Sequence, residues 1–185
     1  MKHNKMLHYI EDVLENMPTD WLNLTTHRLD IYDEELAKTQ FLEEFENLYQ
    51  NNDSKTSSLS ELHTAYDYIR LGHPLSCILE WTVAHLNNLH SENVISFQSK
   101  ITPILAVLRK NLLENKNTQI LYTDQLPEFF DAEVLQSVYG YNFDLKKVVK
   151  KEDIPVFEGS TVFISQDEEL RSIHLLPNID FYIGF

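Results

Sequence analysis

His73 and Cys77 lie four residues apart in the segment Gly72-His73-Pro74-Leu75-Ser76-Cys77, where a helix is expected to begin. A thiol in the first turn of a helix feels the positive end of the helix dipole, and a preceding His could assist its ionisation. This is the chemistry of a thiol nucleophile. A free cysteine is more often a small, buried and inert group. We therefore expect Cys77 to serve packing and to be dispensable for activity.

Ser96 and Lys100 form a second candidate pair, with three residues between them. A nearby Lys can help to deprotonate a Ser in acyl-enzyme chemistry, and some lysines carry a cofactor as a Schiff base. The companion motifs Ser-Asp-Asn and Lys-Thr-Gly of the acyl-enzymes are absent from the sequence. A solvated entry to a helix explains these residues more simply.

Three further groups of residues invite a chemical interpretation. Ser60, His63 and Asp67 have the residue types of a hydrolase triad, but no oxyanion hole is indicated, and an exposed His–Asp pair is the simpler explanation. The eight histidines show no spacing typical of metal ligands, and no glycine-rich phosphate loop is present, so no metal or cofactor is expected. The lysines between residues 146 and 151 precede two acids and are expected on a solvated turn of helix.

Acidic residues form the strongest pattern in the chain. The net charge is −14, and the stretch from Glu11 to Asp53 holds twelve acids against Arg28 and Lys38, a local charge of −10. Such a field repels the phosphates of duplex nucleic acid and anionic membranes, and it attracts basic proteins. Six of these acids are expected on one long helix as the surface that contacts a partner: Asp33, Glu34, Glu35, Glu43, Glu44 and Glu46.

The elements that position these residues are expected to be mostly helices. Apolar residues at helical spacing predict helices over residues 3–17, 33–50 and 103–113, and another that starts at Pro74. Ser58 and Glu61 have the spacing of a capping box at the start of a further helix, which Gly72 would end.

The helix that starts at Pro74 is expected to be the most buried, because apolar residues occupy both of its faces. Leu79 is assigned to its core stripe, so Leu79→Ala should cost about 2–5 kcal/mol.

The pattern changes toward the C-terminus. A short strand is expected at residues 120–122, a helix at 127–139, a turn of helix at 144–151, and three strands at 161–165, 171–176 and 179–183. We therefore expect an α+β fold in which a helical N-terminal two thirds packs with a small C-terminal antiparallel β-sheet. Residues 1–185 are expected to form a single domain, mainly helical over 1–118 and mixed over 119–185.

Cellular location is constrained by the cysteine count and by hydropathy. Cys77 is the sole cysteine, which fits a reducing compartment, and the N-terminus lacks an apolar core of signal-peptide length. The nearly apolar run 101–108 is too short to cross a bilayer. A cytoplasmic protein that contacts no membrane is expected.

The sequence favours a binding protein whose acidic helical surface engages a basic protein, as an inhibitor, immunity factor, antitoxin or decoy would. Charge reversal of Glu43, Glu44 and Glu46 should then slow association before it disturbs folding. The alternative is a small enzyme with a site assembled from scattered residues, with Ser96 and Lys100 or His73 and Cys77 as candidates. A structural subunit with aromatic surface in the C-terminal sheet is a third class.

Overall fold

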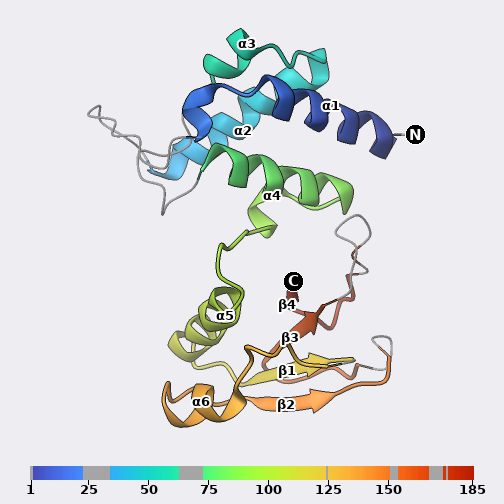
Figure 1. Cartoon of the computed structure of the whole chain (residues 1–185). Coiled ribbons are helices and arrows are strands. Elements are labelled where there is room, and N and C mark those ends of the chain that lie inside the picture. The colour runs from blue at the N-terminus through green and yellow to red at the C-terminus, as the bar shows by residue number, and fades with distance from the viewer. Residues whose placement is uncertain are drawn as a thin grey trace. The chain divides into compact units, whose positions relative to one another are not determined.

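The computed structural model describes residues 2–22, 34–62, 73–123, 125–150, 154–166, 173 and 175–185. These residues form two compact units, Met1–Ser96 and Phe97–Phe185. Unit 1 is helical, whereas unit 2 contains the β-sheet (Figure 1). Of the described residues, no helix is both long and apolar enough to span a membrane.

Unit 1 is built from four α-helices and two short 3-10 helices in its described part. In chain order they are α1 (Lys2–Asn16), η1 (Thr19–Leu22), α2 (Glu34–Asn51), α3 (Thr56–Ser60), α4 (Pro74–Leu86) and η2 (Ser91–Asn93). The expected helices at 3–17 and 33–50 are thus confirmed to within one residue at each end. The residues expected to continue a helix from 63 to Gly72 lie outside the described part of the chain.

The core of unit 1 is aromatic. Tyr9 of α1, Phe45 of α2 and Trp81 of α4 are buried and in contact, with ring centroids 5.9 Å apart for Tyr9–Phe45 and 5.3 Å apart for Phe45–Trp81. Helical spacing places one buried side chain per turn toward these rings, as Phe41 and Phe45 show on α2. The three helices therefore share one core.

Helix α4 is buried on both faces, as its apolar pattern indicated. Eight of its 13 residues are buried, and Pro74 occupies its first turn after the N-cap His73. The assignment of Leu79 to the core was wrong, because its side chain is 48% exposed while its neighbour Ile78 is 3% exposed. An apolar residue at helical spacing can still face solvent when no neighbouring element covers that position.

The capping box expected at Ser58 is not formed. Helix α3 begins at Thr56 after the N-cap Lys55, so Ser58 lies inside the helix and Glu61 follows its end. The Ser58 hydroxyl instead donates to a carboxylate oxygen of Asp53 at 2.7 Å, and this bond is the largest cause of the lowered pKa of Asp53.

Unit 2 contains helices α5 (Thr102–Leu113) and α6 (Ala132–Ser137) and a four-stranded sheet. The strands are β1 (Thr118–Tyr122), β2 (Asp144–Lys147), β3 (Ser160–Ser165) and β4 (Phe181–Gly184), in the order β2-β1-β3-β4. All three pairings are parallel, so the expected antiparallel meander was wrong. The coarser prediction of a helical N-terminal half with a C-terminal sheet is confirmed.

The connections explain why the sheet is parallel. A tight hairpin needs only a few residues between strands, whereas a parallel pair needs a crossover of about a dozen or more. The strands are separated by residues 123–143, 148–159 and 166–180, and the first of these includes α6. Each connection is long enough to return the chain to the same end of the sheet.

Three predictions for the C-terminal region also fail, wholly or in part. Residues 144–147 form the edge strand β2 and not a turn of helix, since they pair with Gln119–Tyr122 of β1. The expected strand over 171–176 falls partly outside the described residues, and Ile173, Leu175 and Leu176 are not in a strand. The helix expected at 127–139 is confined to Ala132–Ser137.

Side chains alternate between two packed faces of this sheet. Ile120 and Val162 pack with Ile104 and Leu108 of α5 on one face. On the other face, Leu121 and Phe163 pack with neighbouring connections, which contribute Ile154, Val148 and Ile179. Gly159, just before β3, lies close to the backbone of Asn117. A Cβ atom at position 159 would lie only 2.4 Å from the carbonyl oxygen of Asn117.

Candidate functional site

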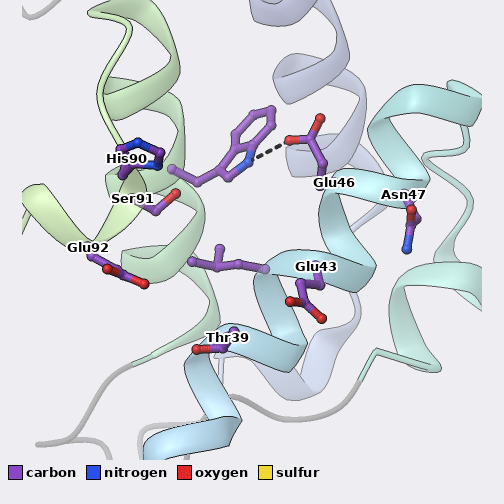
Figure 2. A pocket seen from close by; sticks show the side chains of 9 residues that line it. Thr39, Glu43, Glu46, Asn47, His90, Ser91 and Glu92 are labelled. Atoms are coloured by element: carbon purple, nitrogen blue, oxygen red, sulfur yellow. Dashed lines mark hydrogen bonds between the residues drawn. The ribbon is translucent and has the colours of Figure 1, made fainter.

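A pocket of about 560 Å³ opens on the surface of unit 1 (Figure 2). One wall is a face of α2, the other is formed by Trp81 of α4 and the segment around η2. Its nine lining residues are Thr39, Leu42, Glu43, Glu46, Asn47, Trp81, His90, Ser91 and Glu92. The α2 residues recur every three or four positions, so they lie along one side of that helix.

The η2 wall is positioned by the way α4 ends. Asn88 adopts a left-handed backbone conformation with φ 54°, and the amide of Leu89 donates to the carbonyl oxygen of Ala84 at 2.9 Å. This geometry turns the chain out of the helix. Further along, both the amide and the hydroxyl of Ser96 donate to the buried carboxylate of Glu80, at 2.7 and 2.8 Å. Hydrogen bonds to α4 therefore hold both ends of the segment that carries His90 and Glu92.

Glu46 is fixed on the opposite wall. Its Oε2 accepts a hydrogen bond of 2.9 Å from the indole Nε1 of Trp81, and its Oε1 accepts one from Gln50. Trp81 is 4% exposed and stacks on the ring of His85, with centroids 4.7 Å apart. The carboxylate therefore keeps a defined position in the pocket, and it also satisfies a buried donor.

The lining of this pocket combines acidic and apolar side chains. Its lining, which belongs wholly to the described part of the chain, carries the carboxylates of Glu43, Glu46 and Glu92 and neither Lys nor Arg. Leu42 and Trp81 also line the pocket and contribute apolar surface to it. Lysine and arginine side chains combine an apolar stem with a cationic head, so they match both properties. Among the described residues, no cluster of His, Cys, Asp or Glu is arranged to hold a metal ion.

The structure brings two of the six predicted acids into the pocket. Glu43 is exposed and Glu46 is half-buried, and both line it. Glu44 is half-buried and lies outside the lining. Glu34 and Glu35 belong to the first turn of α2, but their side chains lie outside the description, as does the whole of Asp33.

Sequence reasoning missed the second wall of the pocket. His90, Ser91 and Glu92 are far from α2 along the chain, and only folding brings them opposite Glu43 and Glu46. The Asn87-Asn88 pair was the available signal, because Asn tolerates a left-handed turn at the end of a helix.

His73 and Cys77 both occupy positions that contribute to the fold. The Nδ1 atom of His73 accepts a hydrogen bond of 3.2 Å from the amide of Leu75 and so caps α4. Cys77 is 1% exposed and belongs to the hydrophobic core. That burial agrees with a packing role, and the dispensability of Cys77 for activity stays a prediction.

In the other two candidate groups, the serine hydroxyls are hydrogen-bonded to groups outside the expected constellations. Ser96 and Lys100 both precede α5, which begins at Thr102, and the Ser96 hydroxyl is directed to Glu80. The Ser60 hydroxyl donates to the carbonyl oxygen of Thr56, while His63 and Asp67 lie outside the described residues.

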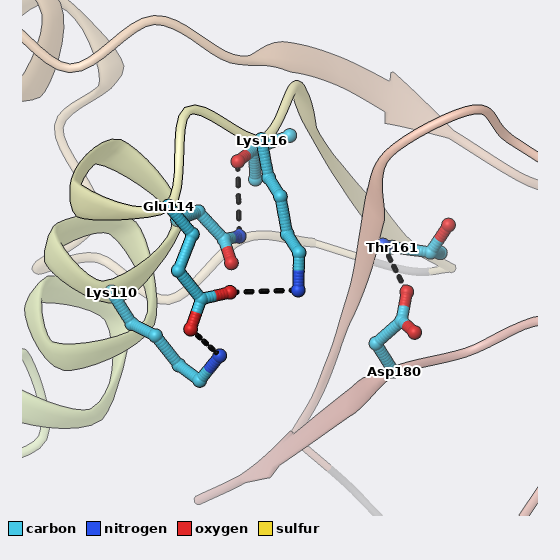
Figure 3. Close-up of polar contacts among 7 residues, drawn as sticks. Lys110, Glu114, Lys116, Thr161 and Asp180 are labelled. Carbon is cyan, nitrogen blue, oxygen red and sulfur yellow. Dashed lines mark hydrogen bonds and ion pairs between the residues drawn. The ribbon is translucent and has the colours of Figure 1, made fainter.

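The lysines at 146–151 also differ from expectation. Lys146 and Lys147 are exposed on the edge strand β2, Lys150 follows it, and Lys151 is not described. Elsewhere in unit 2, Glu114 forms ion pairs with both Lys110 and Lys116 (Figure 3). The hydrogen bonds from these two lysines lower the pKa of Glu114 from its ordinary 4.5 to about 2.

Comparison with known proteins adds no further constraint. No protein-family model matches the chain, and neither a curated protein nor a solved structure shows significant similarity to it.

Proposed function

We propose that unit 1 binds a lysine- or arginine-rich segment of a partner protein and that the pocket between α2 and η2 receives one of its cationic side chains. The observation that carries this proposal is the convergence of Glu43, Glu46 and Glu92 on one open pocket with apolar surface from Leu42 and Trp81. An inhibitor, immunity factor, antitoxin or decoy would act by such an interaction.

The charge of the whole unit supports the same partner. Residues 1–96 contain 16 acids and six lysines or arginines, a net charge of −10, whereas residues 97–185 carry −4. An excess of one sign raises the association rate of an oppositely charged protein, and this steering weakens as salt is added. The field brings a basic segment toward unit 1, and the pocket gives it a fixed point of attachment.

Preorganisation supports the pocket as that point of attachment. Glu46 is fixed by Trp81 and Gln50, and the η2 segment is fastened through Ser96 to Glu80. A carboxylate that is already in place loses less conformational entropy when a ligand binds. Glu43 and Glu92 are exposed and can adjust to the incoming cation.

The test compares two double variants that change the net charge equally. Glu43→Lys with Glu92→Lys reverses two carboxylates of the pocket, and Glu15→Lys with Glu61→Lys reverses two exposed carboxylates of the same unit that do not line it. The probe is a lysine- and arginine-rich peptide, and its association with the full chain is followed by tryptophan fluorescence.

The pocket variant should bind the peptide much more weakly than the matched control, which should show only a reduced association rate. Equal losses in both variants would mean that overall charge, without the pocket, attracts the peptide. Unchanged binding in both would mean that the acidity serves solubility alone.

A further inference from the structure

Two buried polar atoms of unit 2 have no hydrogen-bond partner among the residues that the structure describes. They are Oδ1 of Asn111, in the last turn of α5, and Oγ of Ser160, the first residue of β3. Asn111 is 1% exposed and Ser160 is 2% exposed. Buried polar groups are almost always hydrogen-bonded, to protein or to ordered water, so each of these atoms requires an explanation.

Asn111 and Ser160 are both neighbours of Thr118. Thr118 of β1 is the register partner of Ser160 in β3, and side chains at paired positions of neighbouring strands stand on the same face. Two residues further along, Ile120 and Val162 pack against α5, which identifies this face as the one that α5 covers. The amide Nδ2 of Asn111 donates to the Thr118 hydroxyl at 3.0 Å.

Exchanging the amide oxygen and nitrogen of Asn111 does not remove the problem. In the present orientation Oδ1 lacks a donor, and in the reversed orientation Oδ1 would accept from Thr118 while Nδ2 would lack an acceptor. The Ser160 hydroxyl stays without a partner in both cases. A further polar group is required beside these side chains.

We propose that unit 2 binds an internal water molecule between the end of α5 and the first residues of β1 and β3. The water donates to Oδ1 of Asn111 and accepts from the hydroxyls of Ser160 and Thr118. Thr118 can donate because its oxygen, which accepts from Asn111, still carries a hydrogen. Three protein partners are within the range usual for a buried water.

This water would join three elements by side chains alone. The backbone already brings β1 and β3 together at this point, where the amide of Ser160 donates to the carbonyl oxygen of Asn117 at 2.8 Å. The hydrogen bond from Asn111 already joins the end of α5 to Thr118 of β1, and the water adds the Ser160 side chain of β3 to that pair. The proposal concerns unit 2 and does not depend on the function proposed for unit 1.

A crystal structure of the full chain at a resolution that shows ordered water tests the site. The expected result is a water peak at about 2.7–3.2 Å from both Asn111 Oδ1 and Ser160 Oγ. A direct hydrogen bond between these two atoms, with no such peak, would overturn the proposal.

Oxygen-17 relaxation dispersion, which counts long-lived internal waters, provides the solution test. Asn111→Leu with Ser160→Ala should remove one such water relative to the wild type. Thr161→Val is the matched control, because it removes a buried hydroxyl whose partner is Gln119. If the double variant does not fold, Ser160→Ala alone should shorten the residence time of that water. An unchanged dispersion profile in a folded variant contradicts the site.

Discussion

At the residue scale, Glu46 belongs both to the core and to the proposed binding surface. Its carboxylate satisfies the buried indole N–H of Trp81 and also lines the pocket. The sequence identified it as an exposed acid that could be reversed without harm to folding, together with Glu43 and Glu44. Because of the hydrogen bond to Trp81, we now expect reversal of Glu46 to disturb folding as well, and Glu43, which is exposed, is the suitable residue for reversal.

Glu46→Ala should destabilise the protein by about 1–3 kcal/mol, because it leaves the buried N–H of Trp81 without an acceptor. Glu43→Ala, one turn earlier on the same helix, should change stability by no more than about 0.5 kcal/mol. Urea unfolding followed by tryptophan fluorescence measures both. Equal effects for the two variants would show that the Glu46–Trp81 bond contributes nothing to the fold.

Glu114 provides a pH-dependent prediction at the same scale. Its pKa is about 2 in the folded protein against an ordinary 4.5, owing first to Lys110 and then to Lys116. Its contribution to stability is therefore fully present above about pH 4.5 and is lost as the pH falls toward 2. The difference in urea midpoint between wild type and Glu114→Gln should shrink over that interval and should also shrink with salt, because the group is exposed. A difference independent of pH would contradict the ion pairs.

At the element scale, the longer helices were predicted correctly, whereas the direction of the strands was predicted wrongly. Helical periodicity is local, so α1, α2 and α4 could be located from their apolar residues alone. Strand pairing is non-local, and β2 was mistaken for helix because its edge position leaves only Leu145 partly covered. Connection lengths were a usable signal for parallel strands. The pocket forms because α2 and η2 face each other. This arrangement cannot be predicted from a local sequence pattern.

Helix α4 allows a comparison of adjacent residues. Ile78→Ala should cost about 2–5 kcal/mol, because it removes a side chain that is 3% exposed. Leu79→Ala should cost far less, since nearly half of that side chain is already in solvent. Chemical denaturation of both variants measures the difference. A larger loss for Leu79 would show that another part of the chain covers this position.

At the scale of the whole molecule, the charge and the cores are distributed differently. Unit 1 carries −10 of the net charge of −14, while each unit has its own buried core. The boundary between the units follows Ser96, which is hydrogen-bonded to Glu80, and the surrounding residues Val94-Ile95-Ser96-Phe97 lack the Gly, Pro and Ser enrichment of a flexible linker.

Because the boundary lacks the composition of a flexible linker, we keep the prediction that residues 1–185 unfold as a single domain. Scanning calorimetry should give one transition whose calorimetric and van't Hoff enthalpies agree. Two resolved transitions would show instead that the two units are independent domains.

The most direct test of the binding proposal is to map the bound surface. Backbone amide shifts of the isotope-labelled full chain are followed during titration with the lysine- and arginine-rich peptide. We predict that the largest changes fall on the two walls of the pocket, residues 39–47 and 90–92, and that they weaken between about 50 and 200 mM salt as charges become screened. Changes centred on unit 2, or spread evenly over all acidic residues, would contradict the pocket as the binding site.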